Sequence, residues 1–308
     1  MKERVTVCEV GPRDGLQMAH GMMETGAKLE WIAAMAAAGV REIEVGSFVP
    51  PKVVPQMADT AEVVRGALGI PGLTVLALVP NLKGAQLAYE AGVHTVTLPV
   101  SVSEGHSRSN TNKGTFEQVA VVRDTVRWVR EQERPMRVEA GCATAFGCSI
   151  DGVIPETRVV EVAAALAETG VDSMVLADTV GYGTPAQVRS TIRAVRSAIG
   201  DKLGKLHLHD TMGQGLANAL VGLEEGIRGF DSALAGLGGC PFAPGASGNI
   251  VTDDLVFMLE SMGFETGIDL EKLMESRGLL RRGLPDEPMY GQVARAGIPK
   301  TYQQRSAA

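Results

Sequence analysis

Short runs of apolar and β-branched residues alternate with alanine-rich segments of helical periodicity along most of the chain. Such an alternation of strand-like runs with helical segments predicts repeated strand–helix units. We expect eight strands, at residues 5–10, 42–45, 74–78, 95–100, 137–143, 173–177, 205–209 and 231–235. The eight expected helices cover residues 28–38, 60–67, 82–91, 116–130, 155–169, 185–199, 215–225 and 253–262.

Helix boundary residues support these assignments. Thr184 before Pro185 is typical of an N-cap followed by proline at the first helical position. Gly39, Gly92 and Gly170 each follow an expected helix and are suited to end it. Eight units within about 260 residues predict a TIM (β/α)8 barrel rather than a doubly wound sheet.

The barrel is expected to occupy residues 1–268. Residues 269–308 should add a short C-terminal helical extension and tail to the same domain, with a helix at 270–277 that Gly278 ends. In barrels of this kind the chemistry lies at the carboxyl ends of the strands. Polar residues at those ends are therefore the candidates for function.

His207 and His209 stand at the end of the seventh expected strand. Residues two apart on a strand point to the same side, so the two imidazoles should converge on one point. Histidine is a common ligand of divalent metals. A hydrogen-bonded polar cluster is the alternative explanation for such a pair.

Arg13 and Asp14 follow the first strand in a turn bounded by glycine and proline. This turn can hold a guanidinium and a carboxylate close to a ligand, or it can be a surface turn with an ion pair. Glu44 lies within the apolar run of the second strand and is expected to point inward. These residues are the nearest candidates for partners of the histidine pair.

The segment after the eighth strand, residues 235–249, contains Cys240 among several glycines and ends at Asn249. It matches neither a dinucleotide fingerprint nor a phosphate-binding loop. A flexible lid that carries a thiol is the favoured interpretation, with Cys240 as an inert small hydrophobe as the alternative.

A metal site can be assembled from these strand ends. Mixed nitrogen and oxygen ligation suits Mg²⁺ or Mn²⁺, whereas a structural zinc would require four closed nitrogen and sulfur ligands. The four expected ligands are Asp14, His207, His209 and Asn249.

The amino-acid composition argues against nucleic-acid and membrane partners. The chain has 308 residues, 45% hydrophobic and 21% charged, which is enough for a large core. A net charge of −7 without a basic patch, and only 4% aromatic residues, argue against a nucleic-acid partner. No segment reads as a signal peptide or bilayer span, so no membrane partner is expected. Four cysteines without a C-x-x-C pair predict reduced thiols and a cytoplasmic location.

The motifs together resemble those of the 3-hydroxy-3-methylglutaryl-CoA lyases over nearly the whole chain, from about residue 5 to 274. They are EVGPRDGLQ at 9–17, IEVGSF at 43–48, HLHDT at 207–211, and the block from Ala235 to Asn249 with GLGGCP and GASGN. The resemblance implies a metal-dependent retro-Claisen cleavage of a 3-hydroxyacyl-CoA with a second carboxylate. The products would be acetyl-CoA and a keto acid, acetoacetate for the parent substrate. A homodimer and a place in leucine catabolism are also implied.

The resemblance also implies roles for single residues. The family's cation ligands again fall on Asp14, His207, His209 and Asn249. Arg13 matches the arginine that stabilises the enolate oxygen, Cys240 the thiol of the mobile loop, and Glu44 and Asp178 two further active-site acids. The expected substrate contacts are Arg13, Gln17, Ser47 and Ser103. Asp14 or Glu44 is the expected base, and Cys240 or His207 the proton donor.

Three positions depart from the family pattern: Glu139 stands where a tyrosine is frequent, His106 where an aromatic is usual, and Asp253 where a glutamate is usual. An acid in place of a phenol changes the shape and charge of a pocket, so another 3-hydroxyacyl-CoA, such as citramalyl-CoA, is an alternative substrate. A Claisen-condensing acyltransferase of the same superfamily is a second alternative, although such enzymes are usually longer and lack the thiol loop. A non-catalytic, metal-loaded barrel is the third.

Overall fold

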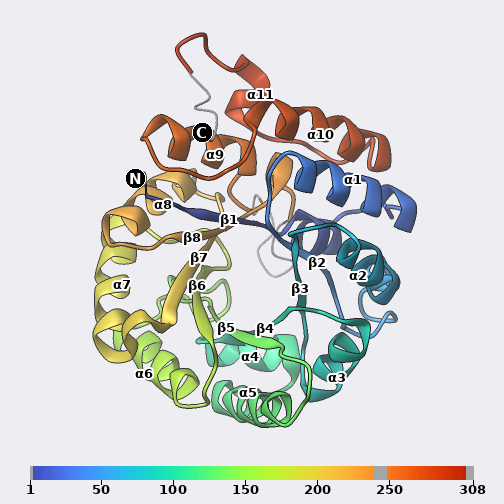
Figure 1. Ribbon diagram of the computed structural model, residues 1–308. Coiled ribbons are helices and arrows are strands. Elements are labelled where there is room, and N and C mark those ends of the chain that lie inside the picture. The colour runs from blue at the N-terminus through green and yellow to red at the C-terminus, as the bar shows by residue number, and fades with distance from the viewer. Residues whose placement is uncertain (1–2, 239–247, 303–308) are drawn as a thin grey trace.

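A computed structural model describes residues 3–238 and 248–302 of the chain. Eight parallel strands close into a barrel in sequence order, with helices around the outside (Figure 1). The expected TIM barrel is therefore confirmed. The strands are β1 (Thr6–Glu9), β2 (Glu42–Ser47), β3 (Thr74–Leu78), β4 (Thr95–Ser101), β5 (Arg137–Ala143), β6 (Ser173–Asp178), β7 (Leu203–Leu208) and β8 (Gly229–Ser232).

The helices around the barrel are α1 (Thr25–Ala37), α2 (Thr60–Leu68), α3 (Leu82–Ala91), α4 (Glu104–Thr111), α5 (Thr115–Arg130), α6 (Glu156–Ala167), α7 (Pro185–Ile199), α8 (Gly215–Glu224) and α9 (Thr252–Ser261). The predicted cap of α7 is confirmed, because the Thr184 hydroxyl accepts a hydrogen bond from the Gln187 amide at 3.3 Å. Trp31 and Met35 are fully buried on α1.

The eighth strand differs from the predicted 231–235. Gly229–Ser232 pairs with β1, and its first residues pair with β7. Beyond Ser232 the chain leaves the sheet and forms a 3-10 turn, η4 (Leu234–Gly236), in which Ala235 has φ 62°. The Leu234 amide donates to the Glu9 side chain and not to a neighbouring strand, so the sheet pairing does not continue through it.

The C-terminal extension contains α10 (Leu270–Gly283) and α11 (Gln292–Ala296). The expected stop at Gly278 is wrong: α10 continues for five residues beyond it. An interior glycine costs a helix about 1 kcal/mol, and burial of Leu280 beyond it offsets this cost. In Figure 1, α10 lies outside the barrel against α1, with α9 beside it.

Helix α4 was not among the predicted helices. Its sequence is almost entirely polar, so it carries no hydrophobic periodicity. Ser103 begins it as an N-cap, and the serine hydroxyl accepts a hydrogen bond from the His106 amide at 3.0 Å. No helix within residues 3–238 and 248–302 has the length and apolar character needed to cross a bilayer.

Candidate metal centre

The turn after β1 places Arg13 and Asp14 at the carboxyl end of the barrel. Residues Gly11–Gly15 form a single π-helical turn, η1, in which the amides of Arg13 and Asp14 both donate to the Val10 carbonyl, at 3.1 and 2.7 Å. Both side chains are largely buried, with 12% and 14% of their surface exposed. The surface-turn alternative is therefore excluded.

Arg13 is held between two carboxylates. Its Nε donates to Glu44 Oε2, and its Nη1 donates to Asp14 Oδ1. Glu44 points inward as expected and also accepts a hydrogen bond from Thr97 on β4. Burial disfavours the charged guanidinium, but the two carboxylates raise the pKa of Arg13.

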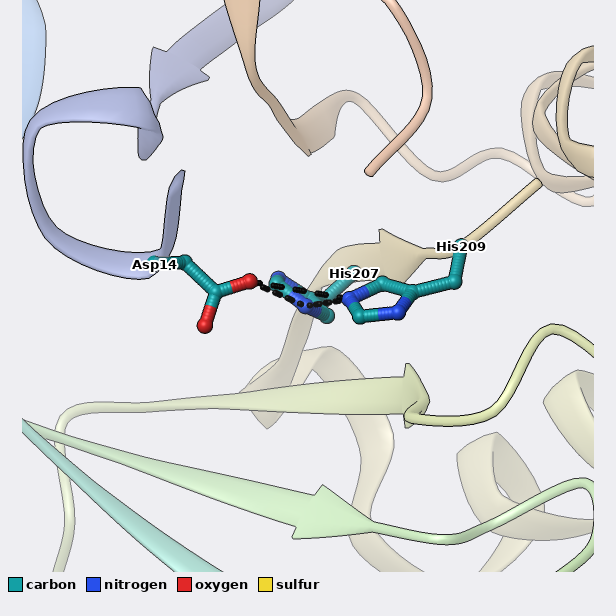
Figure 2. Close-up of side chains that lie close together, drawn as sticks. All are labelled: Asp14, His207 and His209. Carbon is teal, nitrogen blue, oxygen red and sulfur yellow. Dashed lines mark hydrogen bonds and ion pairs between the residues drawn. The ribbon is translucent and has the colours of Figure 1, made fainter. Parts of the chain in front are cut away.

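Asp14, His207 and His209 converge on one point, and Figure 2 shows the three side chains directed toward one another. Asp14 Oδ2 lies 3.8 Å from His207 Nε2 and 3.6 Å from His209 Nε2. The two histidine Nε2 atoms are 3.1 Å apart. One potential ligand atom from each residue lies within 4.8 Å of the others, which is a spacing that one cation can bridge.

Asn249 lies beside this cluster, because its Nδ2 is 2.7 Å from Asp14 Oδ2. Residues His209 and Asn249 form an isolated bridge just beyond the end of β7, so His209 does not belong to the strand itself. Asn249 Oδ1 and His209 Nδ1 are buried and find no hydrogen-bond partner among the described residues. Buried polar atoms without partners fit a site that binds an ion or a ligand.

Electrostatics keep Asp14 ionised. Burial alone would raise the pKa of Asp14, but the Arg13 guanidinium and the neighbouring imidazoles of His209 and His207 hold it well below its ordinary value. An ionised carboxylate beside two imidazole nitrogens is the kind of donor set that binds divalent cations.

Asp231 on β8 orients His207, and the sequence analysis assigned it no role. Its Oδ2 lies 3.2 Å from His207 Nδ1, which leaves Nε2 to face Asp14. The strands β7 and β8 place the two residues directly opposite each other. Asp231 stands at the start of the predicted eighth strand, but only the register of the closed barrel places it opposite His207.

A cavity of about 210 Å³ opens beside the cluster. Its wall includes the predicted residues Gln17 and Glu44 and also Glu139, whose carboxylate bonds to Ser173 at 2.8 Å and Lys205 at 3.4 Å. Burial raises the pKa of Glu139 against the opposing effect of Lys205. Gln17 Oε1 is buried without a partner among the described residues and is free to bind a substrate.

Four predicted site residues in the described parts of the chain do not line this cavity: Asn249, which lies beside the metal cluster, and Ser47, Ser103 and Asp178. Ser47 lines a separate groove beside α2 and α3. Ser103 caps α4 and donates to Asp151 Oδ2 at 2.6 Å. Asp178 accepts hydrogen bonds from the amides of Tyr182 and Gly183 at 3.0 and 2.9 Å. The Asp178 carboxylate is thus engaged with its own loop, whereas the Ser103 hydroxyl bonds to the loop after β5. Cys240 lies outside the described residues.

The barrel and the convergence of Asp14, His207 and His209 define the class as a (β/α)8 barrel with a candidate divalent-metal centre at the carboxyl ends of its strands. Residues 4–280 match the HMGL-like family model, and the chain belongs to this family.

Characterised relatives and solved structures agree with this assignment. The chain is 42% identical over 276 residues to the cytoplasmic 3-hydroxy-3-methylglutaryl-CoA lyase of Rattus norvegicus, covering 90% of this chain and 80% of that protein. It is 39% identical over 274 residues to the hydroxymethylglutaryl-CoA lyase of Bacillus subtilis, covering 89% and 91%. The HMG-CoA lyase of Acinetobacter baumannii, solved with coenzyme A and 3-methylmalate, superposes with a TM-score of 0.91 at 38% identity over 98% of both chains.

A substitution at Asp231 tests whether this carboxylate orients His207. Asp231→Asn is expected to weaken Mn²⁺ binding by about 10- to 100-fold, the usual effect of removing a partner behind a histidine ligand. Isothermal titration calorimetry measures the affinity. The control Asp172→Asn removes a carboxylate at the amino end of β6, where it accepts a hydrogen bond from the Val138 amide, and should leave the affinity unchanged. Equal affinity in Asp231→Asn and the wild type would exclude an orienting role.

Proposed function

We propose that the protein is a carbon–carbon lyase that cleaves 3-hydroxy-3-methylglutaryl-CoA, or a closely similar thioester, to acetyl-CoA and a keto acid. The observation that carries the proposal is the meeting of Asp14, His207 and His209 beside the buried Arg13, in a chain whose relatives are named as lyases of this kind. Acetoacetate is the keto acid from the methylglutaryl substrate, which would place the reaction in leucine catabolism.

Asp14, His207, His209 and Asn249 are the proposed ligands of a divalent cation, Mg²⁺ or Mn²⁺. The charges near the cavity support this: among the described residues its wall holds the acids Asp14, Glu44, Glu139 and Asp231 and one permanent cation, Arg13. Lys205 lies beside Glu139 at 3.4 Å. When bound, a divalent ion offsets this excess of negative charge, orients the substrate oxygens and makes the C3 hydroxyl more acidic.

Arg13 is proposed to stabilise the enolate oxygen that forms as the C–C bond breaks. Glu44 and Asp14 occupy its Nε and Nη1, and within the described residues its Nη2 has no such partner. A guanidinium fixed before the reaction stabilises developing charge without reorganisation during the step. The carboxylates therefore position the arginine, and its remaining N–H groups bind the substrate.

The proton transfers are proposed to use residues that do not hold the cation. A histidine nitrogen that binds a metal must be free of its proton, so a ligand role for His207 leaves Cys240 as the donor to the enolate carbon. Asp14 is a weak base because its pKa is held low. Glu44 is therefore the proposed base for the C3 hydroxyl proton. It lies on β2 and is bonded to Arg13.

The size of the cavity supports an acyl-CoA as the substrate. About 210 Å³ has room for a short branched acyl group, whereas the nucleotide must lie outside it.

We further propose a cytoplasmic location, which the free thiols of Cys8, Cys142 and Cys148 support. The homodimer remains a prediction from the family resemblance.

Glu139 favours a second candidate substrate. Its carboxyl group forms part of the cavity wall and would meet the acyl chain with an acidic group. A pocket that hydrogen-bonds one substrate disfavours an analogue that leaves its buried polar group unpaired by about 10⁴- to 10⁵-fold. The altered pocket would therefore favour a related thioester, such as citramalyl-CoA, with the reaction type retained.

Acetyl-CoA release from a panel of 3-hydroxyacyl-CoA thioesters tests both substrates. We expect cleavage that requires Mg²⁺ or Mn²⁺ and stops with chelator. A clear optimum for the methylglutaryl compound would exclude the second candidate, and no cleavage of any thioester would exclude a lyase. Condensation of acetyl-CoA with a keto acid as the faster direction would instead identify an acyltransferase.

A further inference from the structure

Glu9 is a fully buried carboxyl group at the end of β1, and the proposed mechanism does not use it. It accepts hydrogen bonds from three separate segments. The Gly11 amide donates to Oε1 at 2.8 Å, the Leu234 amide donates to Oε1 at 2.9 Å, and the Thr252 hydroxyl donates to Oε2 at 2.7 Å. One side chain therefore joins η1, η4 and the start of α9.

Each of the three residues that bind Glu9 lies three positions along the chain from a residue at or beside the candidate metal centre. Gly11 begins the turn that carries Asp14. Thr252 follows Asn249 by three positions, and Leu234 precedes Leu237 by three. The Leu237 carbonyl accepts a hydrogen bond from Asn249 Nδ2 at 3.1 Å. The two proposed oxygen ligands are thus connected to Glu9 through short, hydrogen-bonded backbone.

The histidine ligands are fixed by other means. His207 is held by β7 and by Asp231, and His209 by its bridge to Asn249. The centre therefore has a histidine side built on β7 and an oxygen side built on the β1 and β8 loops. The strands β1 and β8 lie side by side in the barrel (Figure 1).

We propose that Glu9 is a positioning residue that holds Asp14 and Asn249 in register with the two histidines for cation binding. This inference rests on the proposed function. Glu9 does not touch the cluster itself, so it acts only through the segments that it binds. Charge-assisted hydrogen bonds are shorter and stronger than neutral ones, which suits a carboxylate to this task.

Gly11 packs directly against Glu9 and Trp31 in this turn. A Cβ placed on Gly11 would come within 2.9 Å of Trp31. Burial raises the pKa of Glu9 to about 7, against the opposing effect of its bonds with Thr252, Leu234 and Gly11. Glutamine, the neutral isostere, can still accept both amide hydrogen bonds through its oxygen and meet Thr252 through its amide.

Two variants of Glu9 test whether its hydrogen bonds position the metal ligands: alanine removes these bonds, and glutamine keeps their geometry. Glu9→Ala should weaken Mn²⁺ binding, measured by the EPR signal of the free ion, by about tenfold or more, as loss of an outer partner of a metal site does. Glu9→Gln should rescue the affinity to within about threefold of the wild type, because the hydrogen-bond geometry is kept. Asp254→Asn is the matched control, since Asp254 is a buried acid on α9 that accepts two amide hydrogen bonds from α11, away from the site. It should bind Mn²⁺ as the wild type does.

Hydrogen exchange provides a readout that needs neither cation nor turnover. In Glu9→Ala, the amides of Arg13 and Asp14 should lose protection while those of β7 keep theirs. Thr252→Val removes the contacts of the Thr252 hydroxyl with Glu9 Oε2 and Ser232 Oγ but leaves both amide hydrogen bonds to Glu9 in place. It serves if Glu9→Ala does not fold, and it should weaken Mn²⁺ binding and reduce protection in the same turn. Wild-type affinity and protection in the folded variants would overturn the proposal. A wild-type protein that binds Mn²⁺ but cleaves no thioester would refute the proposed function alone.

Discussion

Asp14→Asn is expected to lower kcat for thioester cleavage by about 10²- to 10³-fold and to weaken Mn²⁺ binding in parallel. Asparagine keeps the shape of the side chain but removes the negative charge that faces His207 and His209. It also removes one of the two ionic partners of Arg13 and leaves Glu44 as the other. Steady-state kinetics and calorimetry on the same preparations measure the two effects.

Asp59→Asn is the control for Asp14→Asn. Asp59 is also a carboxylate in an ion pair, with Lys28 Nζ at 2.6 Å, but it does not line the cavity. We expect its kcat to stay near that of the wild type. If Asp14→Asn kept full turnover, or lost turnover without any change in Mn²⁺ affinity, Asp14 would not be a cation ligand.

Arg13→Lys is expected to lower kcat by about 10²-fold or more while Mn²⁺ affinity changes little. A lysine has a single ammonium group and cannot reach Glu44 and Asp14 in the planar arrangement that the guanidinium uses. The enolate oxygen would therefore lose a fixed donor. Kinetics with saturating cation measure the effect.

The control for Arg13→Lys is Arg277→Lys, since Arg277 is also largely buried and pairs with Asp253 at 2.9 Å, away from the cavity. It should leave kcat unchanged at a temperature where both variants are folded. Turnover of Arg13→Lys at the wild-type rate would show that a point charge is sufficient and that Arg13 has no role that depends on its geometry.

The barrel could be predicted from the sequence because its core positions repeat with the periods of strands and helices. Helix α4 could not, since Glu104–Thr111 is polar and depends on the Ser103 cap. The end of β8 was misplaced because Ala233 and Leu234 are apolar, yet the Leu234 amide bonds to Glu9 and not to a neighbouring strand. Local composition carries no information about that distant partner.

The candidate site was predictable where residues follow strand ends on the inner face. Asp14, His207 and His209 meet as expected. Ser103 bonds to Asp151 in the loop after β5, and Asp178 bonds to amides of its own loop, so neither position follows from strand periodicity. Asp231 was missed because its importance comes from facing His207 across two strands, a register that only the closed barrel defines.

The position of a bound cation tests the central claim most directly. Crystals soaked in Mn²⁺ and measured for anomalous scattering should give one strong peak, about 2.0–2.4 Å from Asp14, His207, His209 and Asn249. A peak elsewhere, or none at a concentration that saturates the protein in solution, would contradict the account.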